Sequence, residues 1–129
     1  MKRIASIQDV SCLGRCSQTV ALPVVSTMGV ECAILPTAVL STHTSFPDFH
    51  CLDLTDQLLP VARHWKAQGV RFDALYTGYL ASDRQVAVVL ELLELLREEG
   101  TLLFVDPAMA DHGKLYAGFG PEFPALMAQ

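Results

Sequence analysis

Short apolar runs alternate with longer segments of helical periodicity along most of the chain. The runs at residues 3–8, 30–35, 72–77 and 102–105 end at polar, Gly or Pro positions, a pattern typical of strands in a parallel sheet. The last of them, between Gly100 and Pro107, is apolar throughout and predicts a strand that is buried on both faces. The segments between the runs repeat apolar residues every three or four positions, which predicts helices.

Capping residues locate the predicted helices. Ser17 is a candidate N-cap, and Ser82 with Gln85 three residues later forms a capping box. The third helix is apolar on more than one side, so we expect neighbours on more than one side. The predicted helices cover residues 17–28, from residue 53 or 55 to residue 68, 82–99 and 121–127. Strands that alternate with helices predict an α/β fold: a three-layer parallel sheet with helices on both faces.

A segment without regular periodicity, residues 37–53, interrupts this alternation. It is rich in Thr, Ser, His and Phe and contains Pro47, which is typical of a functional loop or flap over a site. Polar loops also follow the other predicted strands. Because the carboxyl ends of parallel strands meet at one edge of a sheet, we expect these loops to form a ligand site together.

Composition limits the classes of function. The 129 residues suit one domain or part of one, and the net charge of −5 without a basic run argues against nucleic acid as a partner. With 51% hydrophobic residues and a mean hydropathy of +0.34, the chain has more apolar material than a core of this size needs, which predicts apolar surface covered by further polypeptide. No stretch is long enough for a signal peptide or a membrane span, so we expect a cytoplasmic protein.

The four cysteines are therefore expected to be reduced thiols, and their spacing completes no usual zinc site. They are Cys12, Cys16, Cys32 and Cys51.

Two carboxylates follow the last predicted strand. Asp106 lies at its carboxyl end, before Pro107, and Asp111 comes five residues later. Carboxylates on such a loop can hold a hydrated Mg²⁺ and the phosphates that it carries. The alternative is that Asp106 only caps the loop while Asp111 is solvated.

Four motifs in order resemble the pyridoxal (pyridoxine, pyridoxamine) kinases of the ribokinase-like superfamily. They are SIQD followed by Gly14, the flap motif STHT at residues 41–44, TGYL at residues 77–80 and DPAMADHGKLY at residues 106–116. The resemblance covers the whole chain. It implies ATP-dependent phosphorylation of the 5′-hydroxymethyl group of a B6 vitamer, with ATP and Mg²⁺ as cofactors.

The resemblance also implies site residues. The vitamer pocket would be lined by Asp9, His43, Thr44 and Tyr79. The ATP phosphates would be faced by Asp106, Asp111 and Tyr116, with Asp106 and Asp111 holding Mg²⁺ through water. Relatives of this family pair as homodimers at full length, so a homodimer is expected for the full-length protein.

Three departures from the family pattern change these expectations. Asp9 stands where many relatives have serine, and a carboxylate there can pair with a protonated ring nitrogen or with an amine. Ala110 replaces a glycine, so we expect weaker nucleotide binding if that position needs positive φ. The family fold is about twice as long, and residues 1–129 match its N-terminal portion, truncated after about four strands.

The segment that carries the family's catalytic base and anion hole has no counterpart here, so no catalytic residue is assigned and we expect this chain alone to be inactive. Two alternatives stay open. One is a non-catalytic vitamer-binding remnant, and the other is a relative of the hydroxymethylpyrimidine kinases.

Overall fold

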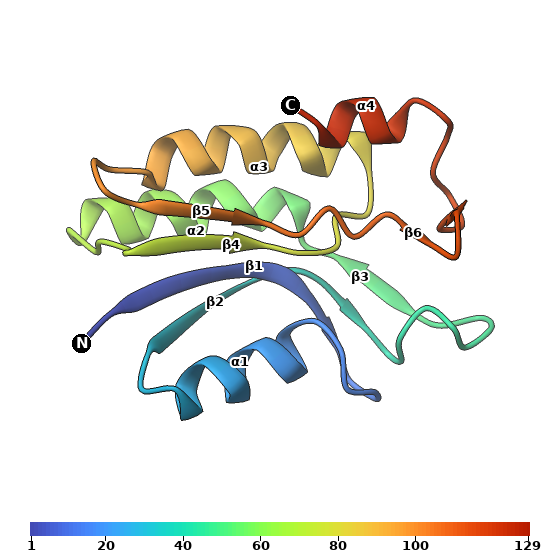
Figure 1. Ribbon diagram of the computed structural model, residues 1–129, viewed down its shortest axis with the longest axis horizontal. Helices are drawn as coiled ribbons and strands as arrows, with labels where there is room; N and C mark the ends of the chain where they lie inside the picture. The colour runs from blue at the N-terminus through green and yellow to red at the C-terminus, as the bar shows by residue number, and fades with distance from the viewer.

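The computed structural model describes residues 1–129 and contains two sheets and four helices. The strands are β1 (Arg3–Ser11), β2 (Glu31–Leu40), β3 (Cys51–Asp53), β4 (Ala74–Thr77), β5 (Leu102–Val105), β6 (Ala110–Asp111) and β7 (Lys114–Leu115), and the helices are α1 (Gln18–Thr27), α2 (Thr55–Ala67), α3 (Asp83–Leu96) and α4 (Phe123–Met127). The main sheet has the order β3-β2-β1-β4-β5, with α1 on one face and α2 and α3 on the other (Figure 1).

The pairing of the strands confirms the predicted three-layer α/β fold. Strands β1, β2, β4 and β5 are parallel, and β6 and β7 form a separate antiparallel hairpin. The sheet has one strand more than the four predicted, because β3 adds antiparallel to β2 at the edge. The flap is correspondingly shorter than predicted: residues 37–40 and 51–53 are paired strands, and the loop itself covers residues 41–50.

Two strands extend past the predicted ends. We expected β1 to end at Gln8 and β2 to end before Pro36, but they end at Ser11 and Leu40. Pro36 pairs with Gln8 in the parallel register, and directly after this pair the register shifts, so that Asp9 alone lies opposite two residues of β2. An irregularity of this kind tolerates the missing N–H of a proline, which is why Pro36 does not end the strand.

The hydrophobic core lies between the sheet and the pair α2 and α3. Ile7 of β1 and Leu75 of β4 meet Leu58 of α2 and Leu92 of α3, all of them fully buried, and Phe123 of α4 closes the cluster. The longest helix, α3, has 14 residues, and no helix in the chain combines the length and the apolar character needed to cross a membrane.

Strand β5 contradicts the prediction that it is buried on both faces. It is the edge strand of the sheet, and Leu102 and Phe104 are 63% and 57% exposed. The reason is that α1 packs on β1 and β2 only, so the face of β4 and β5 on that side has no covering layer. Exposed apolar side chains lie on β5, on α1, and on the flap and β3.

A carboxylate fixes the start of α2. Asp53 accepts hydrogen bonds from the backbone N–H of Thr55 at 2.7 Å and from the Thr55 hydroxyl. These bonds, the hydroxyl bond first, lower the pKa of Asp53 below its ordinary value. A lowered pKa in the folded state stabilises the protein above the unfolded pKa of about 3.9, and this contribution disappears as the pH falls through the folded pKa.

We therefore expect Asp53→Ala to cost about 1 kcal/mol at pH 7 and less as the pH falls below about 4. Urea unfolding followed by the fluorescence of Trp65 measures both effects. Glu94→Ala is the matched control, because Glu94 is an exposed carboxylate of α3 that makes no side-chain hydrogen bond. An equal loss of stability in Asp53→Ala at pH 7 and pH 3 would contradict the assignment.

Candidate functional site

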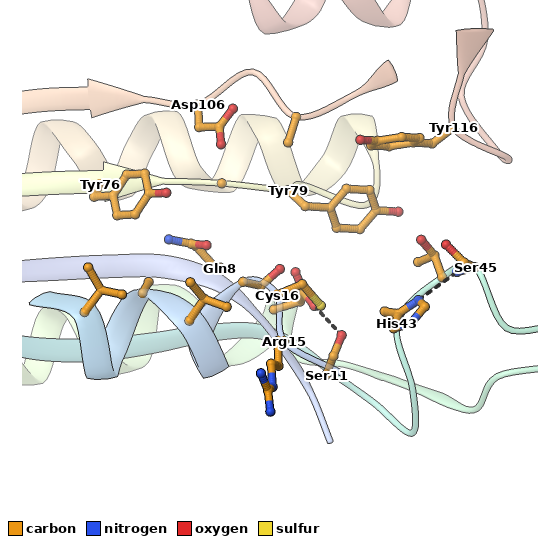
Figure 2. A pocket seen from close by; sticks show the side chains of 18 of the residues that line it. Gln8, Ser11, Arg15, Cys16, His43, Ser45, Tyr76, Tyr79, Asp106 and Tyr116 are labelled. Atoms are coloured by element: carbon orange, nitrogen blue, oxygen red, sulfur yellow. Dashed lines mark hydrogen bonds between the residues drawn. The ribbon is translucent and has the colours of Figure 1, made fainter. Parts of the chain in front are cut away.

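A cavity of about 590 Å³ lies between α1 and the carboxyl ends of β1, β4 and β5. The flap contributes its rim, and residues from four loops that follow strands contribute to its lining, as expected for a parallel sheet (Figure 2). A volume of this size suits a small ligand. The lining residues used below are Gln8, Asp9, Ser11, Arg15, Cys16, His43, Thr44, Tyr76, Tyr79, Asp106 and Tyr116.

The end of β1 supplies three polar groups. In a regular strand Gln8 and Asp9 would face opposite sides, but the register shift lies at Asp9 and both residues line the cavity. Gln8 donates to Ser6 at 3.0 Å, and Ser11 donates to the Asp9 carboxylate at 3.2 Å. The irregularity in the sheet thus places a carboxylate and an amide side by side at the bottom of the site.

The flap is held against the loop between β1 and α1. The backbone N–H of His43 donates to the carbonyl of Leu13 at 3.2 Å, and the imidazole Nδ1 accepts from Ser45 N–H at 3.3 Å. Gly14 has a φ of 125°, and a Cβ built on it would lie 2.7 Å from the His43 ring. A glycine is needed here both for the backbone conformation and for the close approach of the flap.

Aromatic rings form the wall opposite the flap. The Tyr79 ring lies 6.1 Å from that of Tyr116 and 5.8 Å from that of Phe119, and Phe119 stacks on Phe123 of α4 at 3.9 Å. Figure 2 shows the rings of Tyr79 and Tyr116 beside one another above the end of β1. The motif that follows β4 and the loop that follows β5 are therefore joined by ring contacts, which suit a flat heteroaromatic ligand.

The cavity has a negative electrostatic character near β1. Burial, and then the charge of Asp9, raises the pKa of Tyr79. Burial, followed by Asp53 and Asp9, raises the pKa of Cys51 at the base of the flap. Both groups therefore stay protonated and neutral at neutral pH, and neither compensates the Asp9 carboxylate.

The two carboxylates after β5 do not converge. Asp106 lines the cavity, whereas Asp111 lies on the β6–β7 hairpin, is exposed, and approaches only His112 at 3.7 Å. No group of three or more His, Cys, Asp or Glu side chains lies close enough together to hold a metal ion. Asp106 therefore fits a metal held mainly by ligand phosphates and water, and a contribution of Asp111 through water stays a prediction. Ala110 does not have positive φ, so its Cβ is accommodated without backbone strain.

Six of the seven predicted site residues line one cavity. They are Asp9, His43, Thr44, Tyr79, Asp106 and Tyr116. The prediction did not include Gln8, Ser11, Cys16 or Tyr76, which also line it. The alternation of polar Ser6 and Gln8 with apolar Ala5 and Ile7 was a sequence signal for Gln8. Ser11 was missed because the predicted strand ended at Gln8, whereas β1 extends to Ser11.

Sequence comparison relates the chain to one curated protein. No family model matches. A protein of Schizosaccharomyces pombe that is assigned as a pyridoxal kinase is 27% identical over 119 residues, which are 89% of this chain and 38% of the relative.

Solved structures agree in fold. A Bacteroides thetaiotaomicron protein assigned as a phosphomethylpyrimidine kinase is 44% identical with a TM-score of 0.93, over 98% of this chain and 44% of its own. A second crystal form of that protein, with a TM-score of 0.92, contains pyridoxal. Pyridoxal kinase from Lactobacillus plantarum is 35% identical with a TM-score of 0.88, over 98% of this chain and 45% of its own. The chain therefore spans less than half the length of these relatives.

Proposed function

Since this chain is a relative of the pyridoxal kinases in the ribokinase-like superfamily, we propose that it carries the vitamer-binding part of a B6 vitamer kinase. Such an enzyme transfers the γ-phosphate of ATP to the 5′-hydroxymethyl group of the vitamer. The observation that carries the proposal is the convergence on one cavity of six motif residues, which come from the end of β1 and from the loops that follow β2, β4 and β5. The pyridoxal in the Bacteroides relative supports the same class of ligand.

The proposed roles follow from the positions of the side chains. Tyr79 and Tyr116 offer aromatic faces to the pyridine ring, and His43 with Thr44 closes the flap over it. Asp106 faces the same cavity from the end of β5 and would hold Mg²⁺ through water and ATP phosphates. When bound, the metal ion supplies charge compensation for the transferring phosphoryl group. No side chain within residues 1–129 is assigned as the catalytic base.

The exposed side of the sheet supports the proposal that further polypeptide packs against this chain and completes the active site. Val24 of α1 lines the cavity, and the Phe104 ring of β5 lies 5.2 Å from that of Tyr76, which also lines it; both Val24 and Phe104 are apolar and solvent-exposed. A parallel sheet is normally covered on both faces. We propose that residues 1–129 form the N-terminal portion of one ribokinase-like domain, whose catalytic base comes from polypeptide outside this range.

A calorimetric titration of the 129-residue chain with pyridoxal, next to a kinase assay with ATP and Mg²⁺, tests the proposal. We expect pyridoxal to bind and no phosphate to be transferred. Absence of binding by pyridoxal, pyridoxine and pyridoxamine alike would refute the function. Phosphate transfer by this chain alone would agree with the proposed function, but it would refute the proposal that the catalytic base lies outside residues 1–129.

Phosphorylation of a hydroxymethylpyrimidine is a second candidate, favoured by the assignment of the Bacteroides relative. The STHT sequence of the flap at residues 41–44 favours pyridoxal instead. A competition titration with pyridoxal and the hydroxymethylpyrimidine decides between these functions. Tighter binding of the pyrimidine would favour the pyrimidine kinase function over the B6 vitamer kinase function.

We also propose a homodimer for the full-length protein, paired through the flap side. The exposed apolar side chains Phe46 and Phe49 of the flap and Leu52 of β3 support such a contact. Sedimentation of the full-length protein as a monomer would refute it.

The contact between Gly14 and His43 gives a prediction for the flap. We expect Gly14→Ala to weaken pyridoxal binding about fivefold, or about 1 kcal/mol, because the new Cβ displaces the imidazole. Gly29→Ala is the matched control, since Gly29 also has positive φ but no neighbouring atom within 4 Å. Both variants should lose stability, and only the first should lose affinity in the titration. Equal affinity of the two variants would show that His43 does not position the ligand.

A further inference from the structure

Asp9 is a buried carboxylate without a counter-charge. Its residue is 4% exposed, and its one side-chain hydrogen bond comes from Ser11 at 3.2 Å, which is at the long end for such a bond. None of the salt bridges of the chain includes it. A carboxylate buried in this way is costly unless a cation or several donors compensate it.

The surroundings of Asp9 offer no cation from the chain. The basic side chain that lines the same cavity, Arg15, is exposed and extends away from Tyr79 and Asp106 (Figure 2). His43 lies on the flap, where its Nδ1 accepts a hydrogen bond from Ser45. The raised pKa values of Tyr79 and Cys51, to which Asp9 contributes, are consistent with a negative potential that reaches into the cavity.

The Asp9 carboxylate lines the cavity in which a ligand would bind, and it has no cationic partner within the protein. The register shift between β1 and β2 lies at Asp9, which lines the cavity beside Gln8 and Ser11. Ser11 occupies one carboxylate oxygen, Oδ2, and no donor of the chain bonds Oδ1. A ligand that presents a protonated nitrogen there gains a charge-assisted hydrogen bond that a neutral ligand cannot form.

We propose that Asp9 is a specificity-determining residue that favours ligands with a protonated nitrogen in contact with its carboxylate over neutral ligands. The inference rests on the proposed function and adds the charge state of the preferred ligand. Two groups of a B6 vitamer carry the required chemistry: the aminomethyl group of pyridoxamine and the protonated ring nitrogen that all vitamers share.

Titrations of the chain and of Asp9→Asn with pyridoxamine and pyridoxine test the inference. We expect Asp9→Asn to bind pyridoxamine about tenfold more weakly. Unchanged binding of pyridoxine would identify the aminomethyl group as the partner, and an equal loss for both vitamers would identify the ring nitrogen. Asp48→Asn is the matched control, because it removes an exposed carboxylate of the flap that does not line the cavity. Unchanged binding of both vitamers to Asp9→Asn would overturn the inference.

A second measurement is independent of the vitamers. If Asp9 lacks a counter-charge, Asp9→Asn should raise the Tm of the ligand-free chain, whereas loss of a structural ion pair would lower it. A lowered Tm overturns the inference. If no vitamer binds the unmodified chain, the proposed function fails. Benzylamine, which is protonated at neutral pH, then serves as the probe cation, and the inference stands only if it binds the chain and not Asp9→Asn.

Discussion

Replacing Gln85 with alanine is expected to destabilise the folded chain by about 3 kcal/mol. The Gln85 side chain is fully buried at the start of α3. Its carbonyl oxygen accepts from Ala81 N–H at 2.8 Å, and its amide donates to the Thr37 carbonyl at 3.2 Å and to the Thr55 hydroxyl at 3.0 Å. One side chain therefore links the starts of α2 and α3 to the end of β2.

The size of the effect follows from what each partner loses. In Gln85→Ala the Thr37 carbonyl still accepts from Leu54 N–H, and the Thr55 hydroxyl still donates to Asp53. The Ala81 N–H, in contrast, loses its hydrogen-bond acceptor and has no other in the chain. An unsatisfied buried donor costs about 1–3 kcal/mol, and the space left by the side chain adds to that cost.

Urea unfolding measured by the fluorescence of Trp65, the single tryptophan, gives the free energy of unfolding. Gln57→Ala is the matched control, since Gln57 is an exposed glutamine of α2. Gln85→Met keeps most of the volume and removes the hydrogen bonds, so it separates the two contributions. A loss below 1 kcal/mol in Gln85→Ala would mean that water replaces the side chain and that the link is not structural.

The role of Gln85 illustrates how far the sequence predicted the fold. The capping box correctly located the start of α3, because the hydroxyl of Ser82 accepts from Gln85 N–H as the motif requires. The motif alone could not indicate that the Gln85 side chain reaches Thr37, 48 residues earlier, since that contact depends on how the layers pack. Local pattern gives the elements, and the long-range bonds come from tertiary structure.

The wrong strand ends have the same origin. Pro36 was interpreted as a stop because it lacks an N–H, but a parallel partner with a shifted register accommodates it within β2. Likewise, the apolar run of β5 has the same pattern whether or not a second layer covers it, so its exposed face could not be predicted. The β6–β7 hairpin was missed because its two-residue turn has positive φ at both His112 and Gly113, and His-Gly is not one of the residue pairs that usually signal such a turn.

The residues that share the cavity could be predicted better than the strand ends, because they lie at or after the carboxyl ends of strands, and the topology brings these together at one edge. Their roles in binding stay predictions. Asp9, Tyr79 and Asp106 come from three different strands and line one cavity. Asp111 was placed with them by sequence proximity to Asp106. The hairpin directs it into solvent instead, which the loop sequence alone did not indicate.

Replacing Tyr79 with alanine is expected to weaken pyridoxal binding about 30-fold, or about 2 kcal/mol. Tyr79 is half-buried between the cavity and the rings of Tyr116 and Phe119. Its removal takes away both the stacking surface for the ligand and the contact that holds the Tyr116 ring in place. Stacking contributes about 0.5–1.5 kcal/mol beyond the burial of apolar area, and the lost area accounts for the remainder.

Titration of the chain and its variants with pyridoxal measures this loss. Tyr79→Phe should bind within about twofold of the unmodified chain, because the Tyr79 hydroxyl makes no hydrogen bond in the chain and the ring contributes the stacking. Phe49→Ala removes an exposed aromatic of the flap that does not line the cavity, so its affinity should be unchanged. The raised pKa of Tyr79 keeps its phenol neutral beyond the ordinary value of about 10, so ionisation of Tyr79 should not affect binding below that pH. If Tyr79→Phe loses as much affinity as Tyr79→Ala, the hydroxyl and not the ring face recognises the ligand, and the stacking role assigned to Tyr79 is wrong.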